Sequence, residues 1–118
     1  MDAFEDLEVW KRSCRLSVRI YQNLYGSRDW GFRDQITRAA LSVPSNIAEG
    51  YERGSLREYI QFLRIAKGSC GEVRTQLFVG IEAGLVEKRF ALASVEETRE
   101  LSRMLGGLIA KLRSRLKG

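Results

Sequence analysis

The chain has 118 residues, and its 20 lysines and arginines exceed its 15 aspartates and glutamates to give a formal net charge of +5. Hydrophobic residues make up 44% and proline occurs once, proportions that exclude a disordered chain, a collagen-like repeat and a disulfide scaffold. The length predicts a single domain over residues 1–118. No apolar run is long enough for a membrane span, and the acidic start differs from a signal peptide, so we expect a cytoplasmic protein with no membrane partner.

The sequence contains no histidine. This excludes a Ser-His-Asp triad, a Cys-His pair, a histidine-ligated zinc site and the Glu-x-x-His pairs of di-iron bundles within one chain. Cys14 and Cys70 both fall on apolar helical stripes, so we interpret them as free thiols in the core. We therefore expect no catalytic residues, no metal site and no cofactor.

Apolar residues at alternating spacings of three and four predict two helices in the first half of the chain, over about residues 4–25 and 29–51. The buried stripe predicted for the first helix consists of Leu7, Trp10, Cys14, Ser17, Tyr21 and Leu24. That of the second consists of Phe32, Ile36, Ala39, Ala40, Val43 and Ile47. Pro44 lies inside the second helix, where we expect a bend and no break.

Two capping boxes mark the starts of the third and fourth helices. Ser55 with Glu58 predicts a helix over about residues 55–83, ended by Gly84, and Ser94 with Glu97 predicts one over about 94–116. The interior glycines Gly68, Gly71 and Gly80 each cost about 1 kcal/mol relative to alanine, which indicates that a neighbouring backbone approaches closely. The inward residues predicted for the fourth helix are Leu101, Leu105, Leu108, Leu112 and Leu116.

Four amphipathic helices with short connections predict an all-α fold, an antiparallel up-down-up-down four-helix bundle. Further apolar residues lie off the predicted stripes, and this excess indicates self-association. They are Val18, Ile20, Phe62, Ile65, Phe78, Val79 and Ile81.

Several motifs resemble a known family. They are Phe4-x-x-Leu7-x-x-Trp10, Gln35-Ile36-x-Arg38-Ala39-Ala40-x-Ser42, Asn46-Ile47-Ala48-Glu49-Gly50-x-x-Arg53-Gly54-Ser55 and Tyr59-x-x-Phe62-Leu63-x-x-Ala66-x-Gly68-Ser69-x-x-Glu72. Over about residues 4–85 the chain is similar to the four-helix-bundle proteins encoded in intervening sequences of bacterial 23S rRNA genes. The resemblance implies a ring-shaped homopentamer without known catalytic activity, for which nucleic-acid binding is the usual proposal. A related bundle in retroelements has a reverse transcriptase and its RNA as partners, which implies a possible protein partner here too.

Polar residues at helical spacing lie beside the apolar stripes of the second and third helices. Glu49 and Glu72 are the carboxylates that could act as acid and base or hold a hard metal ion. We favour a structural role, in which Arg38 or Arg53 neutralises a half-buried carboxylate and the motif fixes helix register or a subunit contact. The residues assigned to this motif are Gln35, Arg38, Ser42, Asn46, Glu49, Gly50, Arg53, Ser69 and Glu72.

Basic residues are concentrated in the first helix and at the end of the fourth. Glu8 is expected to pair with Arg12, whereas Arg15 and Arg19 have no obvious partner in their own helix. No acid follows Glu100, and no RNA-recognition motif, KH loop or zinc knuckle is present, so any nucleic-acid contacts should be to phosphate. The candidate nucleic-acid-binding residues are Lys11, Arg12, Arg15, Arg19, Arg113, Arg115 and Lys117, with Lys111 beside them.

Two functions remain open at this point. The first is an oligomeric protein that binds RNA or single-stranded nucleic acid through phosphate contacts. The second is an adaptor ring that docks a protein partner, in which the basic residues serve solubility and interchain ion pairs.

Overall fold

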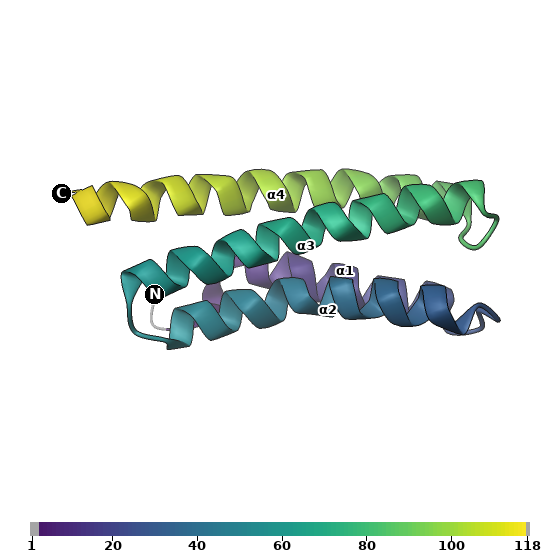
Figure 1. The fold of residues 1–118 in the computed structure, drawn as a ribbon, viewed down its shortest axis with the longest axis horizontal. Coiled ribbons are helices and arrows are strands. Elements are labelled where there is room, and N and C mark those ends of the chain that lie inside the picture. Colours follow the sequence, from purple (N-terminus) through teal and green to yellow (C-terminus); the bar gives the residue numbers. More distant parts are fainter. Residues whose placement is uncertain (1–2, 118) are drawn as a thin grey trace.

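The protein is a bundle of four antiparallel helices, α1 (Glu8–Leu24), α2 (Trp30–Glu52), α3 (Leu56–Glu82) and α4 (Lys88–Lys117), preceded by a 3-10 turn, η1 (Phe4–Asp6). The computed structural model describes residues 3–117, so the first two residues and the last residue of the predicted domain lie outside the described part. Successive helices reverse direction along an axis of 49 Å (Figure 1). The all-α, up-down-up-down four-helix bundle is confirmed. None of the described helices is both long and apolar enough to cross a membrane.

The bounds of α2 and α3 differ by one residue at each end from those that the sequence predicts. The Asp29 carboxylate accepts a hydrogen bond from the backbone N–H three residues on (2.9 Å), and the Ser55 hydroxyl accepts one from that of Glu58 (3.3 Å). Gly54 and Gly84, at φ values of +80° and +72°, follow α2 and α3 in the left-handed region that glycine tolerates best. Local capping chemistry therefore sets these boundaries.

The start of α4 differs from the prediction. The helix begins at Lys88, six residues before the capping box at Ser94, because the Glu87 carboxylate accepts hydrogen bonds from the backbone N–H groups of Arg89 and Phe90. Ser94 is instead a buried residue inside the helix. Glutamate is a less common N-cap residue than serine or aspartate, so the sequence does not readily predict that Glu87 starts the helix.

The buried face of α1 is also rotated from the predicted one. Ile20 is fully buried, whereas Tyr21 is 44% exposed and Cys14 is only half-buried. Ser13 and Ser17 lie in the interface, and the Ser13 hydroxyl donates to the carbonyl of Trp10 (2.9 Å), so the hydrogen bond of this buried serine is satisfied within its own helix. The residues of α1 that are buried are Val9, Ser13, Leu16, Ser17, Ile20 and Leu24.

Helices α2 and α3 together supply about half of the core residues. Ile36, Ile47, Leu63 and Leu77 are fully buried, and α2 continues as one helix through Pro44. The residues of the core are Val9, Leu16, Ile20, Leu24, Ile36, Ala39, Ala40, Val43, Ile47, Ile60, Leu63, Ala66, Cys70, Val73, Leu77, Ala91, Val95, Leu101, Leu105, Ile109 and Leu112.

The interior glycines of α3 divide into two kinds. A Cβ on Gly80 would lie 2.7 Å from the Phe32 ring and 2.8 Å from Val86, so the predicted close approach is present there, made by side chains. For Gly68 and Gly71 the prediction is wrong within the described part of the chain, since no atom would lie within 4 Å of an added Cβ. These two glycines lie on an open face of the helix.

The four seams between helices are not equally close. Helices α2 and α3 contact one another most extensively, whereas α1 and α4 meet over the fewest residues. The last turns of α4 extend past the turn that joins α2 to α3 (Figure 1). For this reason Leu116, predicted to face inward, is 40% exposed. The loose seam and the overhanging end of α4 are where most of the predicted basic residues lie.

Candidate nucleic-acid interface

Arg12 does not belong to an exposed basic stripe. Its guanidinium forms a two-point ion pair with Glu97 of α4, with Nε 3.0 Å from Oε2 and Nη2 2.6 Å from Oε1. This hydrogen bonding raises the pKa of Arg12. The expected pair of Glu8 with Arg12 is therefore wrong, and Glu8 instead lies 3.6 Å from Arg15 in an exposed pair. Arg12 joins α1 to α4 and Arg15 is partly neutralised.

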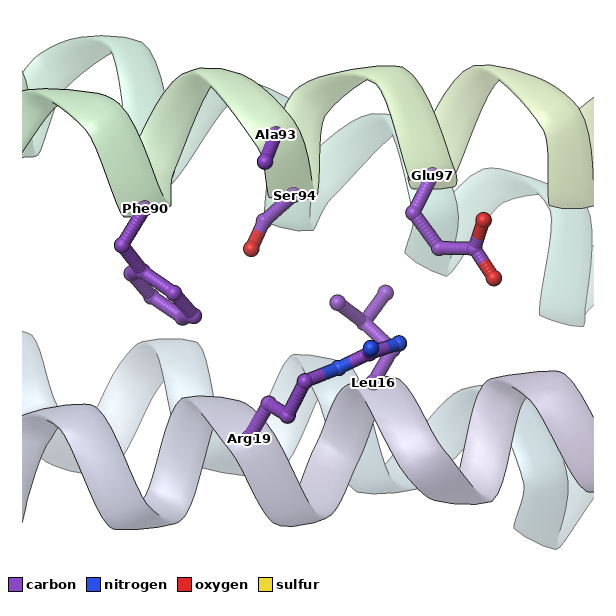
Figure 2. Close-up of a pocket in the computed structure, with 6 residues that line it drawn as sticks. All are labelled: Leu16, Arg19, Phe90, Ala93, Ser94 and Glu97. Carbon is purple, nitrogen blue, oxygen red and sulfur yellow. The ribbon is translucent and has the colours of Figure 1, made fainter.

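Beside this ion pair, α1 and α4 border a groove with a volume of about 190 Å³, which we call the α1–α4 groove. Figure 2 shows Phe90, Ser94 and Glu97 pointing from α4 toward α1, with the Arg19 guanidinium lying between the two helices. Among residues 3–117, Arg19 makes no ion pair. The groove is lined by Leu16, Arg19, Phe90, Ala93, Ser94 and Glu97.

The end of α4 carries four exposed cations, Lys111, Arg113, Arg115 and Lys117, which we call the tail cations. None of them makes an ion pair with a residue in the described part of the chain. They also lie in the last turns of the helix, where the dipole favours positive charge. Their exposure leaves them available to an anionic ligand.

The two basic groups do not form one patch within a chain. Arg19 lies across the groove from Phe90, and the tail cations continue to Lys117, 27 residues further along α4. At about 1.5 Å per residue, the tail cations lie roughly 30–40 Å from the level of Phe90 along the helix axis. A ligand that contacts both must therefore be extended.

The polar motif of α2 and α3 lies along the seam between these helices. The hydroxyls of Ser42 and Ser69 are 2.6 Å apart, the Asn46 amide donates to the carbonyl of Ser42 (2.7 Å), and Gly50 lies against Phe62. These contacts join neutral groups in the closest seam of the bundle.

The charged members of the motif are more exposed than expected. Glu49 pairs with Arg53 (2.8 Å), one of the two arginines expected to neutralise it, and its side chain is 52% exposed. Arg53 also lies over the Phe62 ring, 5.0 Å from its centroid. Glu72, like Gln35 and Arg38, is exposed.

The two carboxylates considered as an acid and base do not meet. Glu49 lies beside the first turns of α3, close to Phe62, and Glu72 follows ten residues later on that helix, which corresponds to about 15 Å. Within residues 3–117, no three Asp, Glu, Cys or His side chains are placed to share a metal ion. The arrangement offers no paired-carboxylate chemistry.

The cysteines occupy two environments. Cys70 is fully buried in the core, and its burial raises the pKa of the thiol to about 11, so it remains a neutral thiol. Cys14 is half-buried on the outer side of α1, beside Arg15, Val18 and Arg19, so its assignment to the core is wrong. Burial raises its pKa as well.

Periodicity did not identify two features of the site. Arg74 donates to the Thr98 hydroxyl (3.0 Å) and to Ser102 (3.1 Å), which fixes α3 against α4. Tyr51 and Tyr59 line a second cavity at the end of the bundle. The sequence does carry an indication of this cavity, because both tyrosines lie next to the α2–α3 turn, where a polar hydroxyl can reach solvent.

Comparison with known proteins places the chain in a family. No curated protein matches it. Its fold is similar to the crystal structure of a protein of unknown function from the S23 ribosomal protein family of Bacteroides thetaiotaomicron, with a TM-score of 0.79, 24% identity and coverage of 86% of this chain and 97% of that one. Residues 5–107 match the family described as "23S rRNA-intervening sequence protein". The chain therefore belongs to the 23S rRNA-intervening sequence protein family.

Proposed function

We propose that this protein is a non-enzymatic RNA-binding protein that holds its ligand through phosphate contacts. The observation that carries the proposal is the set of four exposed tail cations, none of which is paired within the described residues. Surface lysines and arginines of this kind attract phosphate regardless of base sequence. The absence of histidine from the sequence supports a role in binding without catalysis.

The distribution of charge favours an extended ligand. Arg19 and the tail cations are separated by about 30–40 Å, and a nucleic-acid strand presents a phosphate about every 3.4 Å along a helix. One strand or duplex can therefore reach both groups. The family name connects its members with rRNA genes, so a structured fragment of rRNA is the natural first ligand to test.

We also propose that the protein assembles into a homopentamer. Large apolar side chains are exposed at the end of the bundle opposite the tail cations, and burying them between subunits would remove this apolar surface from water. Five copies of a chain with a net charge of +5 would also concentrate positive charge. The side chains concerned are Val18 (53% exposed), Phe78 (43%) and Val79 (55%).

The test is a titration of labelled structured RNA at two salt concentrations, with the oligomer mass fixed by light scattering. The Arg113→Gln, Lys117→Gln double variant removes two exposed cations one helical turn apart. For a single strand, each lost phosphate contact should reduce the slope of log K against log salt by about 0.7, so we expect a loss of roughly 1.4 with unchanged mass.

A matched control removes the same charge elsewhere. Lys88 and Arg89 are exposed at the start of α4, far from the tail cations, and Lys88→Gln, Arg89→Gln should leave the slope unchanged. Equal losses from both double variants would indicate a general charge effect and contradict a local site. Absence of binding by the wild-type protein at low salt would overturn RNA binding.

The second candidate is an adaptor that docks a protein partner, and the exposed aromatic residues Tyr25 and Trp30 favour it. Arg33 lies over both rings, 5.8 Å and 5.7 Å from their centroids. Exposed aromatic and arginine side chains are enriched where proteins meet. A stable oligomer that binds no RNA at low salt would favour this function.

A further inference from the structure

A second cavity opens at the end of the bundle, and we call it the end cleft. It has a volume of about 390 Å³, within the range of small-molecule sites. It forms where α4 extends past the α2–α3 turn, and it is bordered by α2, α3, α4 and Leu7, which lies between η1 and α1. The lining residues are Leu7, Tyr51, Tyr59, Leu108, Lys111, Leu112 and Arg115.

One side of the end cleft is aromatic. The rings of Tyr51 and Tyr59 are 5.6 Å apart at an interplanar angle of 79°, and the Tyr51 ring in turn contacts that of Phe4 at 6.4 Å. Burial raises the pKa of Tyr59 to about 12, so its hydroxyl stays protonated at neutral pH and can donate a hydrogen bond. The two tyrosine rings offer apolar faces, and each carries a polar hydroxyl at its edge.

The other side of the end cleft is cationic. Lys111 and Arg115 are one turn apart on α4 and therefore lie on the same face of the helix, above the buried Leu112. Both are exposed, and neither makes an ion pair within residues 3–117. The cleft thus combines flat aromatic surface, an apolar floor and two positive charges.

We propose that the end cleft binds one nucleotide of a single-stranded RNA, with the base against the tyrosine rings and its phosphate beside Lys111 and Arg115. A nucleotide has this combination of a flat π-surface and an adjacent negative charge, and base stacking on aromatic side chains is the common means of holding single strands. Bases in a duplex are already stacked and cannot enter. The proposal rests on the proposed RNA binding and adds to it a preference for unpaired RNA.

The test compares a labelled 12-nucleotide single strand with a 12-base-pair RNA duplex by fluorescence anisotropy. Tyr59→Leu keeps an apolar side chain but removes the ring, and we expect about tenfold weaker binding of the single strand with unchanged duplex binding. Tyr59→Phe keeps the ring and is the matched control, with expected affinity within about twofold of wild type. Thermal melts establish that each variant is folded.

A second variant avoids any effect on folding. Lys111→Gln, Arg115→Gln changes only exposed side chains and should weaken single-strand binding and lower its salt slope by about 1.4. Photocrosslinking with 4-thiouridine RNA offers a readout from the unmodified protein. We expect crosslinks in the peptides that contain Tyr51 and Tyr59.

The outcomes separate the two proposals. If the wild type binds RNA but both cleft variants bind single strands equally well, or if the crosslinks lie only outside the cleft, the end cleft is not the nucleotide site and RNA binding stands. If the wild type binds neither RNA, both proposals are overturned. In that case a protein partner becomes the candidate occupant of the cleft.

Discussion

The seam between α2 and α3 and the seam between α1 and α4 are built from different residues. In the first, Gly50 lies against Phe62 and the hydroxyls of Ser42 and Ser69 meet at 2.6 Å, so small residues bring the helices together. In the second, the long side chains of Arg12 and Glu97 join the helices. Small neutral residues close one seam, whereas an ion pair spans the other.

This difference determines where a ligand can bind. The α1–α4 groove, with a volume of about 190 Å³, lies between α1 and α4, and the end cleft, with a volume of about 390 Å³, opens at the end of the bundle between α4, Leu7 and the tyrosines of the α2–α3 turn. In the α2–α3 seam the hydroxyls of Ser42 and Ser69 and the Asn46 amide already have hydrogen-bond partners, which leaves them little capacity for a ligand. The close seam stabilises the fold, and the loose seam offers surface to partners.

The largest expected effect comes from adding one carbon to the close seam. A Cβ on Gly50 would lie 2.6 Å from the Cβ of Phe62 and 3.3 Å from the carbonyl oxygen of Tyr59, so Gly50→Ala must push α2 and α3 apart. Overpacking of this kind costs about 1–3 kcal/mol. Urea denaturation followed by circular dichroism measures the loss.

The matched control is Gly107→Ala in α4. No atom lies within 4 Å of a Cβ added there, so the free energy of unfolding should rise by about 0.5–1 kcal/mol through helix propensity alone. If the two variants had equal stability, the close approach at Gly50 would not contribute to the fold.

The same contrast explains which parts of the fold were predictable. The stripes of α2 and α3 were read from spacing because their buried residues are nearly all apolar. The face of α1 was misjudged because its interface includes Ser13 and Ser17, while Tyr21 and Cys14 lie outside the core. Spacing alone cannot distinguish a buried serine from an exposed one.

The candidate site was less predictable than the fold. The sequence identifies the tail cations, because no acid follows Glu100. It could not show that Arg12 pairs with Glu97, which is 85 residues away, since only the packing of α1 on α4 brings them together. The end cleft arises from the overhang of α4, which depends on relative helix lengths and leaves no periodic pattern.

A smaller effect is expected when the ion pair of the loose seam is broken. Arg12→Met or Glu97→Gln should each lower stability by about 1 kcal/mol, because the pair retains some solvent contact, with side-chain exposures of 30% and 20%. A double-mutant cycle should show coupling between the two residues. If the two losses of stability were strictly additive, Arg12 and Glu97 would not interact. The exposed pair of Arg99 with Glu96 is the control, and for it we expect no measurable coupling.

The smallest effect is expected for Glu49→Gln. Glu49 is half exposed, and in the variant Arg53 would keep Glu58 at 3.5 Å and the Phe62 ring beneath it, so we expect an unchanged melting temperature. A fall of several degrees would show that the carboxylate helps to fix the register of α2 and α3, against this expectation. Light scattering tests the other predicted role of Glu49, a contact between subunits. A lower oligomer mass at an unchanged melting temperature would place Glu49 at such a contact. The close seam would then serve both the fold of one chain and the assembly of several.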